Sequence, residues 1–557
     1  MRFLFSLRTF ASAAAASVAA AGSCYAATSP LSDPASTYAS SYAVVISEET
    51  HADPAWKSVA DALLSKYPGA KLIVHDGGVS TALEKLAAAM PRHTAFVARP
   101  KECTRDYIAD IHHLTRLLDD DPWLDTQWGV ITGENAAGAL RLASAKEPLV
   151  VKKALATTGL NDRIFEEYFL IADGGPAGSW HWKKPDGSVQ KGVGFPDKNE
   201  VFAFAEQFES GPDLVVTSSH GYENGVEMPL TIPQERRGIL RVAPNGRIYP
   251  IGGLRQGPAK GAKPLADTQK PKVWFPVGNC LLGHVLGEKC MTTALLSHYG
   301  VNQFPGYTVN TWFGRGGWAM LGYWSTLPGR NTLTESFFFN QQNMLRDIHR
   351  IDPKGLDYRM PFGPENRPTP IEAHVRAMYA AGLSFNPQRL NDRKSNDFEL
   401  TGLLWDFDTV AFYGDPAWRA TLDASREKHF LTTRLESQGN THTFTVDIRD
   451  AERAAKNGTP IGVVFTGRLK NIKVISGSQY QPLIADNFIM LFNPRPAKIK
   501  TDKAAEDGKD GKAAEEGKEG KDGKEGKAAK YAKTIVVQFT GDPVDAPVVR
   551  RRVIRDR

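Results

Sequence analysis

Two apolar runs in the sequence each lead into a side chain suited to nucleophilic catalysis. Residues 214–217 lead through two serines to His220 and Gly221, and residues 273–277 lead through a glycine and an asparagine to Cys280. In open parallel sheets, ligands bind beyond the carboxyl ends of the strands. If the two runs are neighbouring parallel strands, the imidazole and the thiol emerge side by side at that edge. The imidazole could then take the thiol proton, and the thiolate could attack a carbonyl carbon.

The backbone beside these two side chains could stabilise the negative charge that such an attack creates. The amides of Gly221 and Cys280 are candidate donors to the carbonyl oxygen, and one such donor contributes on the order of 3 kcal/mol. A glycine after the histidine also lets the backbone approach a substrate closely. Taken singly, a cysteine after an apolar run is usually an inert core residue, and a lone histidine usually has a structural role. Their matched positions at two strand ends favour the catalytic interpretation.

The surrounding segments must form the sheet that positions this pair. Short apolar runs alternate with helical patterns from Tyr42 to about Trp324. Strands are expected near 42–46, 71–74, 94–98, 128–132, 168–172, 213–217, 272–275 and 306–310, and helices near 53–64, 81–90, 107–118, 201–208 and 291–299. Strands that are apolar on both faces and alternate with helices indicate a parallel sheet covered on both sides. We therefore predict an α/β protein with two consecutive open, mostly parallel subdomains over 27–150 and 151–425.

The chain between the two apolar runs carries a hairpin signal. Residues 238–242 and 247–249 are strand-like and flank Asn245-Gly246, which favours a tight hairpin turn. This hairpin could form a flap over the cleft. Pro276 lies inside the second run, although the central ladder of a sheet disfavours proline.

The texture changes after about residue 426. Residues 441–446, 461–465 and 535–539 are short β-branched or alternating runs typical of antiparallel strands. We predict a small β-sandwich over 426–557. It is interrupted at 498–533 by a tract of Lys, Glu, Asp, Gly and Ala that has almost nothing to bury, and this insertion is predicted to be disordered.

Composition limits the class of protein and its partners. The 557 residues are 41% hydrophobic and 23% charged, as in soluble globular proteins. The net charge, 68 − 62 = +6, is too small and too dispersed to indicate a nucleic-acid partner. No stretch after the N-terminus is long and apolar enough to cross a bilayer. The oligomeric state is left open.

The N-terminus is typical of an exported protein. Residues 1–26 combine Arg2 and Arg8, an alanine-rich apolar run and a small residue, Ala26, at a plausible cleavage position. This pattern predicts a secretory signal peptide and a secreted, periplasmic or cell-surface protein. The alternative is lipidation at Cys24. Cleavage after Ala26 leaves three cysteines, at 103, 280 and 290, so at least one thiol stays free in an oxidising compartment.

The order of several short motifs resembles the gingipain-type cysteine peptidases, relatives of caspases and legumains. The family places His-Gly and the catalytic Cys at the ends of consecutive core strands, as with His220-Gly221 and Cys280 here. Further similar motifs are Trp-Gly-Val-Ile-Thr-Gly at 128–133, Ile-Ala-Asp-Gly-Gly-Pro at 171–176, Thr-Val-Asn-Thr-Trp at 308–312 and Phe-Tyr-Gly-Asp-Pro at 412–416. The resemblance spans about 42–425 and implies a caspase-like fold followed by an immunoglobulin-like domain.

The resemblance also implies roles for individual residues. Thr311 and Trp312 would line the pocket for the residue before the cleaved bond, and Trp318 would form a further wall, although core packing is the alternative for both tryptophans. Asn279 stands beside this pocket, where the family usually has a small residue. Glu134 is the nearest candidate for the acidic partner of the histidine. No cofactor is required; structural calcium is a further expectation of the family, with no assignable ligands.

The function expected on these grounds is a secreted cysteine endopeptidase acting on polypeptides. Cys280 would be the nucleophile and His220 the general acid and base, and the reaction would pass through a thioacyl-enzyme. Two alternatives remain open. One is a catalytically inactive surface or binding protein on the same scaffold, and the other is a self-processing or transpeptidase relative that uses the same pair.

Overall fold

The structure is a computed structural model that describes residues 31, 36, 38–172, 174–196, 198–363, 370–497 and 531–544. The predicted signal peptide, Cys24 and residues 498–530 of the predicted insertion lie outside the described residues. Within the described part, no helix combines the length and the apolar character needed to span a bilayer.

A single twelve-stranded sheet forms the centre of the α/β part. Its strands, in spatial order, are β2 (Lys71–His75), β1 (Tyr42–Ser47), β3 (His93–Val97), β4 (Gln127–Ile131), β17 (Val410–Gly414), β16 (Val301–Tyr307), β15 (Lys272–Pro276), β10 (Leu214–Thr217), β6 (Lys153–Ala156), β7 (Glu167–Ile171), β8 (Ser179–Lys183) and β9 (Val189–Val193). Neighbouring strands from β2 to β17 and from β16 to β7 are parallel, and antiparallel pairs occur at β16–β17 and at the β8–β9 edge. The predicted α/β class with a mostly parallel sheet is therefore confirmed.

Strand β17 joins the two predicted subdomains into one sheet. It pairs with β4 of the first half through Tyr413↔Val130 and runs antiparallel to β16 of the second half. The expected strand at 306–310 lies earlier, at Val301–Tyr307. Polar residues hid its start, because Gln303 is buried and its amide donates to Thr334 Oγ1 and to two backbone carbonyls. Pro276 is the last residue of β15, where a missing amide interrupts no further pairing.

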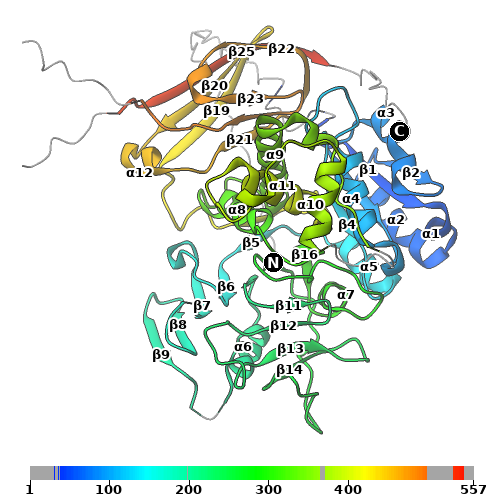
Figure 1. Cartoon of the computed structure of the whole chain (residues 1–557), viewed down its shortest axis with the longest axis vertical. Coiled ribbons are helices and arrows are strands. Elements are labelled where there is room, and N and C mark those ends of the chain that lie inside the picture. The colour runs from blue at the N-terminus through cyan, green and yellow to red at the C-terminus, as the bar shows by residue number, and fades with distance from the viewer. Residues whose placement is uncertain are drawn as a thin grey trace, which may run out of the picture.

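Helices cover both faces of the sheet (Figure 1). The helices of the α/β part are α1 (Glu48–Ala52), α2 (Pro54–Lys66), α3 (Leu83–Ala89), α4 (Arg105–Leu114), α5 (Ala136–Ser144), α6 (Glu200–Glu209), α7 (Met291–His298), α8 (Arg315–Ser325), α9 (Leu333–Ile351), α10 (Ile371–Ala380) and α11 (Asn396–Phe407). Asp53 caps α2 as its sequence predicts, because its side chain accepts from the amide of Ala55 and Pro54 occupies the first turn.

The predicted hairpin is present in a small antiparallel sheet between β10 and β15. This sheet consists of β11 (Gly221–Tyr222), β12 (Gly225–Glu227), β13 (Ile239–Val242) and β14 (Ile248–Ile251). The amide of Ile248 donates to the hydroxyl of Tyr299, and a Cβ at Gly246 would lie 2.7 Å from a carboxylate oxygen of Glu134. These contacts hold the hairpin against the end of α7 and the start of α5.

Two further sheets form the C-terminal part, drawn in orange to red at the top of Figure 1. One contains β19 (Leu431–Gln438), β20 (Thr441–Ile448), β25 (Thr534–Val544) and β22 (Arg468–Ser476), and the other contains β21 (Ile461–Val464), β24 (Phe488–Leu491) and β23 (Pro482–Ile484), with α12 (Ala451–Lys456) between β20 and β21. Side chains from both sheets share one core cluster, which includes Phe444, Phe539 and Leu491. Short strands β5 (Leu149–Val151) and β18 (Ala420–Leu422) pair separately. The immunoglobulin-like topology stays a prediction.

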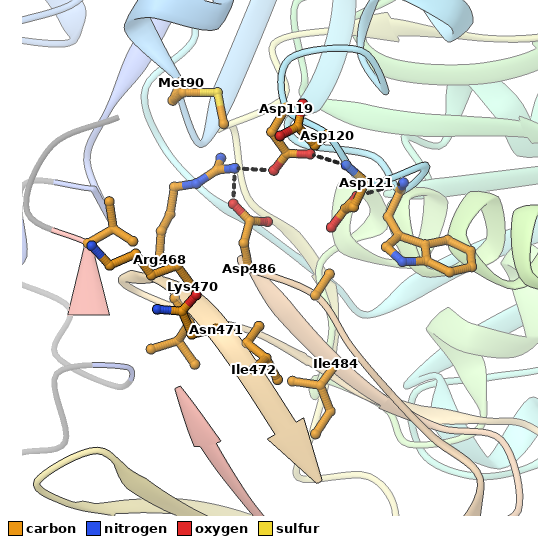
Figure 2. A pocket seen from close by; sticks show the side chains of 14 residues that line it. Met90, Asp119, Asp120, Asp121, Arg468, Lys470, Asn471, Ile472, Ile484 and Asp486 are labelled. Atoms are coloured by element: carbon orange, nitrogen blue, oxygen red, sulfur yellow. Dashed lines mark hydrogen bonds and ion pairs between the residues drawn. The ribbon is translucent and has the colours of Figure 1, made fainter. Parts of the chain in front are cut away.

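Arg468 joins the C-terminal sheets to the α/β part. Its guanidinium contacts carboxylates of Asp119 (3.2 Å), Asp125 (3.5 Å) and Asp486. Figure 2 shows Arg468, Asp119 and Asp486 at a cavity of about 400 Å³ between the two parts. Burial and the neighbouring carboxylate of Asp119 raise the pKa of Asp125 well above its usual range, although Arg468 opposes this effect. One guanidinium therefore forms ion pairs with three neighbouring carboxylates at this interface.

Candidate active site

Strands β10 and β15 are parallel neighbours in the middle of the sheet. Their register pairs Leu214 with Val273 and Thr217 with Pro276, so both strands end at the same level. His220 follows three residues beyond one strand end, and Cys280 follows four residues beyond the other. The expected pairing of the two runs as neighbouring parallel strands is therefore observed, and the loops that carry His220 and Cys280 leave the sheet at the same edge.

The loops that follow the two strands are in direct contact. A Cβ at Gly221 would lie 2.6 Å from the carbonyl oxygen of Cys280 and 3.0 Å from the Cβ of Asn279. Real Cβ atoms do not come this close to backbone oxygen, so only glycine fits here without moving the cysteine loop. From the sequence, this glycine was expected to let a substrate approach; in the structure it packs the two loops together.

Asn279 fastens the histidine loop to the cysteine loop from beneath. Its side chain is fully buried, its Oδ1 accepts from Thr217 Oγ1 at 2.7 Å, and its Nδ2 donates to the carbonyl of Ser219 at 2.9 Å. A substrate cannot reach this amide, so the expected substrate contact of Asn279 is replaced by a positioning role. The larger side chain at this position is explained by these three hydrogen-bonding partners, of which the third is Ser219 Oγ at 3.2 Å.

Cys280 differs from the other described cysteines in its exposure. It is half-buried and its Sγ accepts the backbone amide of Thr311 at 3.3 Å, whereas Cys103 and Cys290 are buried. Burial raises the pKa of both buried thiols. The residue after Cys280, Leu281, has a φ of 61°, which is unusual for a residue with a branched side chain. Such backbone strain occurs often at functional sites.

Gly221 is oriented to act as a backbone donor. The amide of Glu227 donates to the carbonyl of His220, so His220 and Glu227 form a hydrogen-bonded pair of the β11–β12 ladder. Hydrogen-bonded and non-hydrogen-bonded pairs alternate in antiparallel ladders. The next pair, Gly221↔Val226, is therefore of the second kind, and its amide points away from β12. This orientation suits the oxyanion role predicted for Gly221.

His220 is exposed at this edge. Among the described residues, no hydrogen bond joins its imidazole to the thiol of Cys280 or to a carboxylate. Glu134, the predicted acidic partner, lies elsewhere: its carboxylate contacts His298 Nε2 at 2.5 Å, and its amide donates to Ser297 Oγ at 2.8 Å. The structure thus pairs Glu134 with a different histidine, at the end of α7.

A carboxylate that was not predicted from the sequence, Glu223, lies between the two loops. Glu223 Oε1 contacts His284 Nδ1 at 3.1 Å and Arg105 Nη2 at 3.3 Å. Burial opposes ionisation of Glu223, but the hydrogen bond from His284 and the charge of Arg105 outweigh it and lower the pKa of the carboxyl. Burial lowers the pKa of His284, which favours its neutral form. Glu223 and His284 follow His220 and Cys280 by three and four residues, and this matched spacing is the signal that could have found them.

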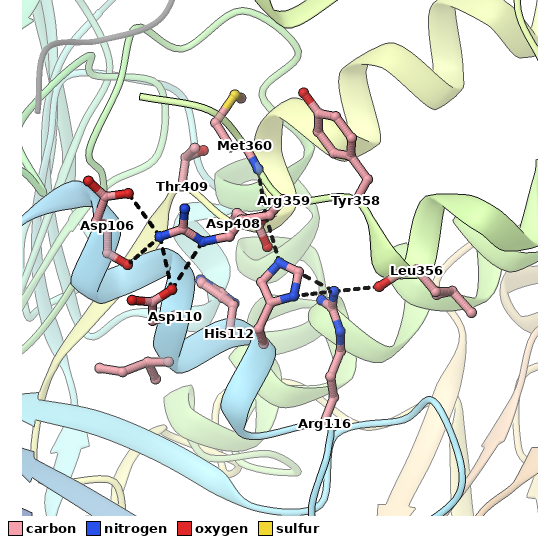
Figure 3. A network of polar contacts seen from close by, with 12 residues as sticks. Asp106, Asp110, His112, Arg116, Leu356, Tyr358, Arg359, Met360, Asp408 and Thr409 are labelled. Atoms are coloured by element: carbon pink, nitrogen blue, oxygen red, sulfur yellow. Dashed lines mark hydrogen bonds and ion pairs between the residues drawn. The ribbon is translucent and has the colours of Figure 1, made fainter. Parts of the chain in front are cut away.

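Arg105 connects this ion pair to the other half of the sheet. It begins α4, is almost fully buried, and its Nε donates to the carbonyl of Thr308 at 2.6 Å. Figure 3 shows Arg359 beside Asp106 and Asp110 of α4, whose carboxylates it contacts at 2.8 and 2.9 Å. On the same helix, His113 Nε2 contacts the carboxylate of Asp408 at 3.1 Å. The base of the candidate site is therefore fixed from both halves of the molecule.

The remaining predicted residues lie beside the cysteine loop. Thr311 contacts Cys280 through its amide. Trp318 is 42% exposed, and its Nε1 lies 3.5 Å from the position of a Cβ on Gly278. Trp312 is 39% exposed and packs against Phe398 with ring centroids 5.3 Å apart. Both tryptophans are thus partly exposed, but Trp318 lines an apolar groove and Trp312 does not.

Three carboxylates far from Cys280 are the candidate ligands for a cation. Among the described residues, Asp119, Asp121 and Asp486 bring oxygens within 4.8 Å of one another. Carboxylate oxygens are the ligands that hard cations such as calcium prefer, so these three residues could hold such an ion. The guanidinium of Arg468 already contacts two of them, and it supplies part of the positive charge that a calcium ion would bring.

Comparisons with known proteins give only distant structural matches for this chain. No protein-family model matches it. No curated protein matches it. Among solved structures, it is similar to the Arg-specific cysteine proteinase gingipain R, with 10% identity and a TM-score of 0.33 over 82% of this chain and 91% of that one. It has the same identity and TM-score to a complex of Porphyromonas gingivalis RgpB pro- and mature domains, over 81% and 93%. A protease structure matches with 9% identity and a TM-score of 0.34, over 73% and 85%. At these values we infer chemistry only from this chain's own residues.

Proposed function

We propose that this protein is a cysteine-type endopeptidase with Cys280 as the nucleophile and His220 as the general acid and base. The observation that carries the proposal is the in-register parallel pairing of β10 and β15, which brings both loops to one edge of the sheet. The half-buried thiol of Cys280 and the exposed imidazole of His220 lie on the loops that follow.

The reaction would proceed through a thioester. The imidazole of His220 takes the thiol proton, and the sulfur of Cys280 forms a bond to the carbonyl carbon of the substrate. The amides of Gly221 and Cys280 donate to the oxygen that becomes negative. The imidazolium returns its proton to the nitrogen of the breaking peptide bond, and the amine leaves. His220 then deprotonates a water molecule that hydrolyses the thioester and regenerates the thiol.

The decisive test is covalent labelling with a peptide electrophile. We expect a peptidyl acyloxymethyl ketone to modify Cys280 in the mature protein, as read by mass spectrometry of tryptic peptides. Cys280→Ala and His220→Ala should both abolish cleavage of a denatured protein substrate. Cys103→Ala, the same change at a buried cysteine, is the matched control and should keep activity. Equal cleavage by the Cys280→Ala variant would refute the proposal.

A binding protein on the same scaffold is the second candidate. This candidate is favoured because, among the described residues, no hydrogen bond joins the side chains of His220 and Cys280. If this candidate is correct, iodoacetamide still alkylates Cys280, but the His220→Ala change leaves the alkylation rate unchanged. In a peptidase the same change slows the alkylation, because the imidazole promotes thiolate formation.

A further inference from the structure

An apolar groove runs along α8 beside the candidate site. It encloses about 230 Å³ between α8 and the segment that follows β6. Its aromatic lining residues are Phe165, Trp318 and Trp324, and leucine and isoleucine side chains supply most of the rest. No charged side chain is among the described residues that line it; Asn161 and Ser325 are the polar ones with side chains. A cavity of this size holds one large side chain.

One border of the groove is continuous with the cysteine loop. The first turn of α8 packs on the end of β15, because a Cβ at Gly317 would lie 2.1 Å from the carbonyl oxygen of Val277. In the same turn, Trp318 lines the groove and places its Nε1 3.5 Å from the Cβ position of Gly278. Gly278 precedes Cys280 by two residues. The indole therefore separates the groove from the nucleophile loop by one side chain.

The opposite border is continuous with the histidine loop. The amide of Ser218, two residues before His220, donates to Thr157 Oγ1 at 3.0 Å. Gly159 follows Thr157 by two residues and lines the groove. Neither loop lines the groove itself, but Trp318 and Gly159 border it next to the two loops, and from there it extends toward Leu214 at the start of β10.

We propose that the groove receives an aromatic or large aliphatic side chain of the substrate, from the residue that supplies the attacked carbonyl. This inference rests on the proposed peptidase function and names its substrate class. Burial of such a side chain favours cleavage by about 10- to 150-fold over glycine. Arginine, lysine, aspartate and glutamate are rejected, because the groove would desolvate their charge without offering a partner.

Gly322 allows the groove to be filled without disturbing the fold. It lies in α8 on the wall of the groove, and no heavy atom of the described residues lies within 4 Å of a Cβ built there. A side chain larger than hydrogen therefore fits and removes a glycine from a helix interior, which favours the helix. Gly257 is the matched control, because it is exposed, also has open space around its Cβ position, and lies outside the lining of the groove.

The experiment compares Gly322→Leu, Gly322→Ala and Gly257→Leu with the unchanged protein. The substrates are fluorogenic tetrapeptides that differ only in the residue before the coumarin amide: phenylalanine, leucine, glycine, arginine or glutamate. We expect phenylalanine and leucine to be cleaved best. The Gly322→Leu change should lower kcat/KM for phenylalanine at least 10-fold and leave it nearly unchanged for glycine. Gly322→Ala should fall between, and Gly257→Leu should match the unchanged protein.

A binding measurement separates failure of this inference from failure of the proposed function. Titration calorimetry follows an uncleaved phenylalanine peptide amide binding to Cys280→Ala, with and without Gly322→Leu. If arginine or glutamate peptides are cleaved best, or if Gly322→Leu does not change kcat/KM for phenylalanine, the groove assignment is overturned and the proposed peptidase function still stands. No cleavage of any peptide, together with phenylalanine-peptide binding that Gly322→Leu abolishes, overturns the peptidase and supports an aromatic side-chain site. If no peptide is cleaved and the phenylalanine peptide does not bind, both the peptidase proposal and the groove assignment are overturned.

Discussion

Replacing Asn279 by aspartate should place a carboxyl group where the structure supplies no positive charge. The Asn279 side chain is fully buried, and its Nδ2 donates to the carbonyl of Ser219 at 2.9 Å. In Asn279→Asp this donor becomes an acceptor that faces another acceptor. Burial can raise the pKa of a carboxyl by about 3–5 units, and each unit corresponds to about 1.4 kcal/mol. Because the unfolded carboxyl titrates near pH 4, only the roughly 3.5 units up to pH 7.5 contribute, and we expect Asn279→Asp to lose about 4–5 kcal/mol of unfolding free energy at pH 7.5.

The pH dependence of that loss distinguishes a charge effect from a packing effect. In the variant the carboxyl would have a raised pKa in the folded state and a pKa near 4 in the unfolded state, so the destabilisation grows as pH rises through this window. Near pH 4 the carboxyl is protonated in both states, and its hydroxyl can donate to Ser219 as the amide does. Asn279→Ala leaves two buried groups without a partner, which costs about 2–6 kcal/mol at every pH.

Between pH 7.5 and pH 4.5 Asn279→Asp should therefore regain about 3–4 kcal/mol relative to Asn279→Ala, and it should be the more stable variant at pH 4.5. Urea unfolding followed by tryptophan fluorescence measures each against the unchanged protein at the same pH. The alkylation rate of Cys280 reports whether the two loops keep their arrangement. If Asn279→Asp stays within about 1 kcal/mol of the unchanged protein at pH 7.5, Asn279 does not fasten the loops as described.

Three further outcomes test other parts of the structure. In the folded protein a neutral thiol reagent should modify Cys280 and spare Cys103 and Cys290, whose thiols are buried with raised pKa values; comparable labelling of either by mass spectrometry would contradict this. Burial lowers the pKa of His374 to about 4, below its unfolded value near 6.5. The unfolded state therefore binds the proton first, and up to about 3 kcal/mol of unfolding free energy is lost on acidification from pH 6.5 to 4. His374→Gln should reduce this pH dependence in urea titrations, and an unchanged pH dependence would argue against the shift. Arg468→Met should cost about 3–5 kcal/mol, because carboxylates at the interface lose their cation; calorimetry should show that calcium raises the Tm of this variant more than that of the unchanged protein, and no response in either would exclude the three-carboxylate cation site.

The strands that could be predicted are those whose neighbours follow from a local pattern. Segments such as β1 and β10 are apolar on both faces, which identifies a buried parallel strand without further information. Strand β16 was misplaced because its polar start, at Asn302 and Gln303, is satisfied by distant partners. The place of β17 between the halves depends on pairing Tyr413 with Val130, and no local pattern encodes that contact.

In the candidate site, too, residues set by a local pattern could be predicted, and residues set by tertiary contacts could not. His220 and Cys280 could be paired from the sequence, because each ends a strand with a clear pattern and parallel strands end at one edge. Glu134 could not be assigned, since its position in the chain says nothing of the tertiary contact that turns it toward His298. Glu223 was overlooked because its role depends on a buried arginine from a remote helix.

The central sheet cannot be completed until nearly the whole α/β part has been synthesised, because β17 lies near the end of that part and between its two halves. Until residues 410–414 leave the ribosome, β4 and β16 each present an uncovered backbone edge, and such edges recruit other chains. A fragment that stops short of this strand would contain almost every element of the sheet and still lack the piece that seals its two halves. Nascent chains of this protein therefore carry an aggregation hazard that ends only with the insertion of their last central strand.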